Sequence, residues 1–250
     1  MTKKFRITRA IIIVLATILV LLIALLLWLI LGDTTGQSGV PTNVSVDSTD
    51  QALTESSETP VDSFNEVSLG ENLFIVKASG YSGRFMEDGT DVAVSDVFAL
   101  TIENRSAAMV QYVQISVTLE EETYFFDLTS LPAGASALVL EKTAAAMPAD
   151  LSQAQYAVIQ RANFSQTPSL YPELFQIYAS DGTIIIENIS DTDISGEIYV
   201  YYKTCVDGVY MGGITYRTGI QGLKAGEQLD CIAAHYTEED GVILFVTYVP

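Results

Sequence analysis

The sequence predicts a mainly β protein that follows one N-terminal transmembrane helix. Three observations support this fold class. Residues 10–31 form an unbroken apolar run, residues 32–65 are rich in serine, threonine and acidic residues, and the rest of the chain alternates apolar with polar residues. An apolar run of this length spans a bilayer, whereas a period of two is typical of half-buried strands. We therefore expect a helix, a stalk and a β-rich C-terminal part, in that order.

The run at residues 10–31 contains no charge, proline or glycine. As a helix it is about 33 Å long, at ~1.5 Å per residue, which is enough to cross a hydrocarbon core of ~30 Å. A cleaved signal peptide has a shorter apolar region that ends in small residues, whereas this run ends with Trp28 and three large aliphatic residues. The sequence thus predicts an uncleaved anchor.

Basic residues before the apolar run set its orientation. They are Lys3, Lys4, Arg6 and Arg9. The positive-inside rule places residues 1–9 in the cytoplasm as a short basic tail. We expect a single-pass protein of the cell membrane, with a cytoplasmic N-terminus and an extracellular C-terminal part.

Residues 32–65 predict a disordered acidic stalk. This stretch has no lysine or arginine, and its first aromatic residue is Phe64. Such a composition cannot bury enough apolar area to offset the entropy lost on ordering. As a coil, its ends would lie ~30–35 Å apart, from ~5–6 Å times the square root of its length.

Charge and cysteine content narrow the choice of partners. The net charge is −19, and all 31 acidic residues lie beyond the basic tail. An acidic surface repels nucleic acid and anionic lipid, so we exclude nucleic acid as a partner. The two cysteines, Cys205 and Cys231, lie far from the apolar run, so neither fits a lipid attachment. Two cysteines in an extracellular region form a candidate disulfide.

The C-terminal part contains two similar halves. The segment at residues 102–106, Ile-Glu-Asn-Arg-Ser, matches Ile-Glu-Asn-Ile-Ser at residues 186–190. A Leu-x-Ala-Gly segment follows in each half, ending at Gly134 and at Gly226, and the second half has extra residues in a hairpin around Asp207-Gly208. Asparagine and serine at a strand end bond to nearby backbone, so the motif predicts a duplicated turn.

Strand spacing predicts the extent of the two halves. Each half has about six apolar-polar alternating segments separated by turns, which indicates a small antiparallel sandwich. Leading strands are expected at residues 73–78 and 174–179, and closing strands at residues 155–163 and 242–249. We predict β-sandwich domains at residues 66–165 and 170–250.

The strand order and the two shared motifs resemble tandem immunoglobulin-like modules of membrane-anchored bacterial surface proteins. The resemblance covers residues 66–250 and concerns architecture. The chain lacks the Cys–Trp–Cys pattern of true immunoglobulin domains, since its only tryptophan is Trp28. The resemblance implies antiparallel sandwiches on the cell surface, and it names no ligand.

No catalytic motif is evident. The single histidine, His235, follows no recognisable nucleophile motif, and the chain has no glycine-rich phosphate loop with a lysine. One histidine and two cysteines do not make a typical zinc site. Acidic loops at residues 191–193 and 238–241 offer the oxygen ligands that calcium prefers, without the spacing of a known calcium loop. We expect a non-enzymatic protein with no cofactor and no metal, and calcium remains an alternative.

Tyrosines supply the candidate binding surface. Strict alternation places Tyr199, Tyr201 and Lys203 on one side of a strand. Ile198, Val200 and Tyr202 lie on the opposite side. If this second set faces the core, Tyr199 and Tyr201 form an aromatic surface that suits protein or glycan contacts. Alternatively, the tyrosines pair across strands within the sheet or are covered by the first domain.

The functional hypothesis is a non-enzymatic, membrane-anchored extracytoplasmic protein whose tandem β-sandwich modules mediate protein–protein contacts at the cell surface. The alternative is a ligand-binding module for cell-wall glycan or another extracellular small molecule, and the third option is a spacer. The membrane contact is the helix at residues 10–31, and the other partner is an unidentified extracytoplasmic protein or a cell-wall glycan.

Overall fold

The computed structural model describes residues 64–249, which are mainly β-strand and contain no helix. Within this range, no helix is long and apolar enough to cross a membrane. The predicted cytoplasmic tail, the transmembrane helix at residues 10–31 and nearly all of the predicted stalk lie outside the described residues. The expectation of a mainly β C-terminal part is confirmed.

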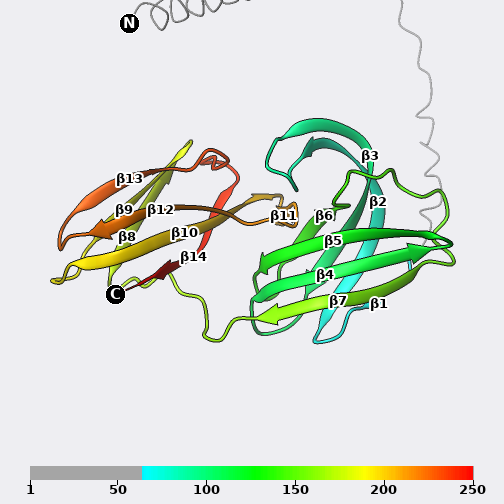
Figure 1. Cartoon of the computed structure of the whole chain (residues 1–250), viewed down its shortest axis with the longest axis horizontal. Coiled ribbons are helices and arrows are strands. Elements are labelled where there is room, and N and C mark those ends of the chain that lie inside the picture. The colour runs from blue at the N-terminus through cyan, green and yellow to red at the C-terminus, as the bar shows by residue number, and fades with distance from the viewer. Residues whose placement is uncertain (1–63, 250) are drawn as a thin grey trace, which may run out of the picture. The chain divides into compact units, whose positions relative to one another are not determined.

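The first half comprises seven strands in two sheets (Figure 1). One sheet has the order β1-β2-β3-β6 and the other the order β5-β4-β7, and all these neighbours are antiparallel. Buried side chains from both sheets, such as Ile75, Leu100, Ile115 and Phe126, form one core. The strands are β1 (Val67–Ser68), β2 (Leu73–Phe85), β3 (Val92–Asn104), β4 (Val110–Leu119), β5 (Glu122–Leu131), β6 (Ser136–Leu140) and β7 (Gln155–Asn163).

The second half has its own core between a separate three-stranded sheet and a set of strands that continues the β1-β2-β3-β6 sheet of the first half. One sheet has the order β8-β9-β13, and in the other β10 lies between β12 and β14. Ile186, Ile198, Val200 and Val246 are among the buried residues that fill this core. The strands are β8 (Phe175–Ser180), β9 (Thr183–Asn188), β10 (Ile194–Val206), β11 (Val209–Met211), β12 (Tyr216–Leu223), β13 (Gln228–Ile232) and β14 (Gly241–Tyr248).

The two halves share one strand order. The β2-β3-β6 arrangement recurs as β8-β9-β13, and the β5-β4-β7 arrangement recurs as β12-β10-β14. The closing strand β7 coincides with the predicted one, whereas β2 continues to Phe85, beyond the predicted end at residue 78. This extension arises because β2 and β3 form a long hairpin that continues past two register shifts.

The shared Asn-x-Ser motif forms the same corner in both halves. Asn104 and Asn188 are completely buried at the ends of β3 and β9. The amide nitrogen of each donates to backbone carbonyls, and its oxygen accepts from the backbone and hydroxyl of the serine two residues later. The partners are Ala108 O (2.8 Å), Leu131 O (3.1 Å) and Ser106 for Asn104, and Thr192 O (2.8 Å), Leu223 O (3.1 Å) and Ser190 for Asn188.

The glycines of the second motif complete this corner. Gly134 N donates to Asn104 O at 2.7 Å, and Gly226 N donates to Asn188 O at 2.9 Å. Both glycines adopt positive φ, 71° and 70°, a conformation that favours glycine because it lacks a Cβ. The prediction of a duplicated turn is therefore confirmed.

The extra residues of the second half connect it to the first. They form the β10–β11 hairpin, whose turn residues Asp207 and Gly208 both have positive φ, as a type I′ turn requires. Strand β11 then pairs in parallel with β6 of the first half (Figure 1). At the equivalent place, the first half has only a two-residue turn between β4 and β5. The insertion thus adds a strand to the neighbouring sheet.

Candidate functional site

An aromatic face lies on the outer side of the β12-β10-β14 sheet. In the centre of β10, Ile198 and Val200 are buried, whereas Tyr199 and Tyr201 are half-buried. This alternation agrees with the expected period of two. Because the buried residues belong to the core of the second half, the two tyrosines point to the other side of the sheet.

Neighbouring strands hold these tyrosine rings in place. The ring of Tyr201 stacks on Phe245 of β14, with centroids 4.4 Å apart and planes 16° from parallel. Phe164 meets Phe245 edge-on at 5.3 Å. The guanidinium carbon of Arg217, on β12, lies 4.7 Å from the centroid of the Tyr199 ring. We call Tyr199, Tyr201, Arg217 and Phe245 the aromatic face.

A glycine on β12 makes room for one of the rings. Gly219 pairs with Tyr199, and a Cβ at Gly219 would lie 2.5 Å from Cδ1 of that ring. The ring therefore packs directly on the backbone, a position that larger residues would block. Nearby charges act on the polar tips: Glu197 raises the pKa of the Tyr199 phenol, and Tyr201 raises the pKa of the Arg217 guanidinium. At neutral pH the Tyr199 phenol is therefore neutral and lies beside the Arg217 cation.

Lys203 does not belong to the aromatic face, and its predicted place on that surface is wrong. The alternation of β10 continues, since Tyr202 is buried in the same core as Ile198 and Val200. Lys203 lies on the other side of the strand, as the tyrosines do, but the first half covers it there, so it is buried too. The cation of the face is instead Arg217, which pairs with Tyr201 across strands. Sequence reasoning missed Arg217 because the residue opposite a strand position depends on the register of a separate strand.

The amine of Lys203 lies where the hairpin of the second half meets the first half. It donates to Thr129 O of β5 and to Gly213 O, both at 3.2 Å. Gly213 approaches β5 so closely that a Cβ would lie 1.7 Å from Asp127 O, so only glycine fits without displacing the strand. The carboxylate of Glu87 accepts from Gly213 N at 2.8 Å and from Leu140 N at 2.8 Å.

Burial shifts the pKa of both ionisable groups at this contact. It lowers the pKa of Lys203 to about 7 and raises the pKa of Glu87, because a low-dielectric environment disfavours each charged form. The attraction between the two groups acts in the opposite sense on each and is the smaller effect. We assign this polar cluster to the contact between the halves, where it satisfies backbone groups.

The predicted disulfide is absent, since Cys205 and Cys231 are both free thiols. Cys231 is buried in the core of the second half on β13, and Cys205 lies at the end of β10, opposite Tyr210 of the hairpin. The two residues belong to different sheets.

The acidic loops make their hydrogen bonds within the second half, whereas His235 contacts Asp91 of the first half. Asp193 accepts from Ala225 N at 2.9 Å, and Asp181 accepts from Glu238 N at 2.7 Å. Nδ1 of His235 lies 3.2 Å from Oδ2 of Asp91, and its ring stacks on Tyr216. Across residues 64–249, no three histidine, cysteine or acidic side chains gather as metal ligands would.

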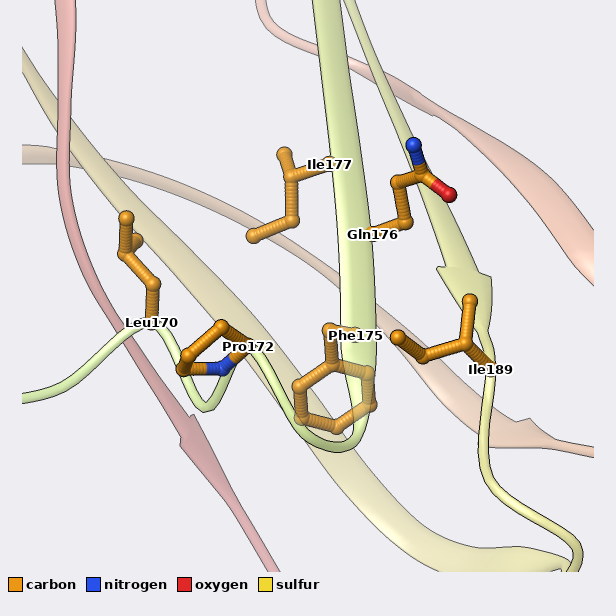
Figure 2. A pocket seen from close by; sticks show the side chains of 6 residues that line it. All are labelled: Leu170, Pro172, Phe175, Gln176, Ile177 and Ile189. Atoms are coloured by element: carbon orange, nitrogen blue, oxygen red, sulfur yellow. The ribbon is translucent and has the colours of Figure 1, made fainter.

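A second candidate site is an apolar hollow at the start of β8. Its volume is about 350 Å³, and Figure 2 shows its lining around the first residues of the strand. The lining residues are Leu170, Pro172, Phe175, Gln176, Ile177 and Ile189. Sequence reasoning missed this hollow, although one signal was present: Ile189 stands where the repeated motif has Arg105 in the first half.

Comparisons of the chain with protein-family models, curated proteins and solved structures found no match.

Proposed function

We propose that this chain is a non-enzymatic, membrane-anchored extracytoplasmic protein whose tandem immunoglobulin-like modules mediate protein–protein contacts at the cell surface. The observation that carries the proposal is the aromatic face of the second half. Tyrosine and arginine are enriched among the residues that dominate the energy of protein interfaces. Here the two tyrosines and Arg217 share one sheet surface.

The rings of the aromatic face are ordered before any partner arrives. Tyr201 stacks on Phe245, and Tyr199 lies between Arg217 and the backbone at Gly219. A preorganised ring loses little side-chain entropy on binding, so more of its contact energy is available for affinity. This order supports a contact surface of defined shape.

The first half provides an internal comparison. The equivalent strand β4 carries Tyr112 and Gln114, and both donate to Asp127 at 2.9 Å. Lys142 also binds Asp127, at 2.6 Å. These polar groups are paired with one another, whereas the second half presents stacked rings at the same place in the fold. The contrast supports a specialised surface on the second half, since shared architecture alone would give the same face twice.

The membrane anchor and the extracytoplasmic location are proposed from the sequence. The apolar run at residues 10–31 and the basic residues before it support a single membrane pass with the C-terminal part outside. The shared strand order of the two halves supports the immunoglobulin-like description.

Photo-crosslinking of the full-length protein on intact cells tests the proposal. A photoreactive residue replaces Thr247, an exposed residue that pairs with Tyr199 on β14. The matched control carries the same group at Ala157, an exposed residue on β7, the equivalent strand of the first half. We expect a discrete crosslinked protein from position 247, none from position 157, and loss of the product in the Tyr199→Ser/Tyr201→Ser variant.

Two results would contradict this proposal. Identical products from both positions would indicate random collision. Retention of the protein on purified cell wall, with loss of retention in the double tyrosine variant and no protein crosslink, would favour the glycan alternative.

A further inference from the structure

The segment that leads into each half pairs with a different sheet. In the first half, Val67 and Ser68 form β1 on the outer edge of β2, opposite Ile75 and Phe74. In the second half, the equivalent residue Ser169 bridges to β14, in the other sheet. The lead-in segment therefore pairs with the edge strand β2 in the first half, but it does not pair with the equivalent edge strand β8 in the second half.

The correspondence between the two lead-in segments follows from their hydrogen bonds. Asn72 O accepts from the residue after Asn104, and Leu174 O accepts from the residue after Asn188. The next residues, Leu73 and Phe175, pair with the two buried asparagines. Counting back from these anchors aligns Val67 with Ser169.

The outer edge of β8 is consequently unpaired within the described residues. Strand β8 is the terminal strand of the β13-β9-β8 sheet. An uncovered edge presents backbone donors and acceptors to which another strand can pair. The apolar hollow of about 350 Å³ lies beside this edge (Figure 2). Side chains around the edge are unusually exposed for their type: Leu170 is 40% exposed, Tyr178 44% and Ile189 46%.

A difference between the two halves indicates what kind of strand fits. In the first half, Arg105 binds Glu66, which precedes β1, through two hydrogen bonds of 3.0 and 2.6 Å. In the second half, the residue in place of Arg105 is Ile189. Arg105 binds an acidic side chain in the first half, whereas Ile189 presents an apolar surface at the equivalent position of the second half. Acidic residues flank the site, with Glu173 before β8 and Glu187 on β9.

We propose that the outer edge of β8 and the adjoining hollow form a docking site for an extended apolar segment of a partner protein. The segment adds to β8 in antiparallel orientation, as β1 adds to β2, and it carries an apolar residue over Ile189 and basic residues at its ends. Backbone pairing supplies affinity, and the hollow selects the side chain. A second copy of this chain is a poor occupant, because its own β1 segment would place Glu66 over Ile189.

The site is separate from the aromatic face, which lies on the other sheet of the second half. The two proposals therefore fail independently. A docking test is possible with peptides that copy residues 64–70, because Val67 and Ser68 of this segment already pair with the equivalent edge of the first half. One peptide has the native sequence, and the other carries Glu66→Leu; both have lysines added at each end.

Fluorescence anisotropy on the full-length protein in nanodiscs measures binding, with empty nanodiscs as the blank. We expect the leucine peptide to bind at least about tenfold more tightly than the native peptide, since one more apolar side chain is buried. In the Ile189→Arg variant the preference reverses, because the arginine recreates the partner of Glu66. N-methylation of the leucine peptide along one edge abolishes binding, and N-methylation along the other edge does not.

Equal binding of both peptides to the native protein and to the Ile189→Arg variant would overturn the proposal. Binding that survives N-methylation of either edge would also overturn it, since backbone pairing is then not involved. Sedimentation of the peptide-free protein gives an independent outcome: a dimer that dissociates on Ile189→Arg substitution would identify a second copy as the occupant and refute the partner segment.

Discussion

The buried amine of Lys203 makes the stability of this fold depend on pH in a way that can be calculated. Lys203 is 1% exposed, and its amine donates to two carbonyl oxygens at 3.2 Å. Its pKa is about 7 in the folded protein, compared with 10.5 for an ordinary lysine side chain in water. The perturbation to test is Lys203→Met, which keeps the aliphatic stem and removes the charge.

The sign of the effect follows from proton binding. Between pH 7 and pH 10.5, Lys203 binds a proton more readily in the unfolded chain than in the folded protein, so the free energy of unfolding rises with pH. With these two pKa values the rise from pH 7 to pH 9 is about 2 kcal/mol. Below pH 7 the dependence on Lys203 flattens, because the amine is protonated in both states.

Other groups with shifted pKa values change the free energy of unfolding either outside pH 7 to 9 or in the opposite direction to Lys203. The raised pKa of Glu87 makes stability fall as pH rises above the ordinary glutamate value of 4.5. The raised pKa of the Cys231 thiol makes stability fall as pH rises through 9. Comparison of the native protein with the Lys203→Met variant between pH 7 and pH 9 therefore cancels the groups that do not interact with Lys203, such as Cys231, and leaves the effect of the lysine with its neighbour Glu87.

Urea denaturation of residues 59–250, followed by near-ultraviolet circular dichroism, measures the effect. This range is the compact unit that contains every described strand. From pH 7 to pH 9, we expect the free energy of unfolding of the native fragment to rise by about 2 kcal/mol more than that of the Lys203→Met variant. Lys224→Met, at an exposed position, is the control and should keep the native profile. Parallel pH profiles for the native and Lys203→Met proteins would refute the calculation.

Three further predictions follow from the corners, the aromatic face and the cysteines. Asn104→Ala and Asn188→Ala should each destabilise the fold by about 3 kcal/mol in urea titrations, because each leaves several buried backbone groups unpaired; a loss below about 1 kcal/mol in either would contradict the shared corner. Gly219→Ala should displace the Tyr199 ring and reduce crosslinking from position 247. Gly182→Ala strains the backbone through its φ of 70° but meets no atom within 4 Å, so folded molecules of this control should crosslink as the native protein does. Both thiols should be titratable after denaturation without reductant, and dithiothreitol should not change the melting temperature; a fall in that temperature would show that a disulfide exists.

Local chemistry explains which features were predictable from sequence. The Asn104 corner depends largely on residues within a few positions, so the motif was enough to predict a turn. Burial of Ile198 and Val200 follows from alternation alone. Lys203 was misplaced because its burial depends on the approach of β5 from the first half, which is not encoded near residue 203. Arg217 and the hollow beside β8 likewise depend on pairings between distant segments.

The differences between the halves lie at the edges of a shared strand order. In the sheet that contains β2, β3 and β6, the chain itself covers both edges: β1 pairs with β2, and β11 pairs with β6. In the equivalent sheet of the second half, the lead-in segment crosses to β14, and β8 stays unpaired within the described residues. Covered edges prevent unwanted strand pairing, so an uncovered edge beside an apolar hollow is consistent with a site to which another strand binds. The aromatic face belongs to the same half, so both proposed contact surfaces lie where the second half departs from the first.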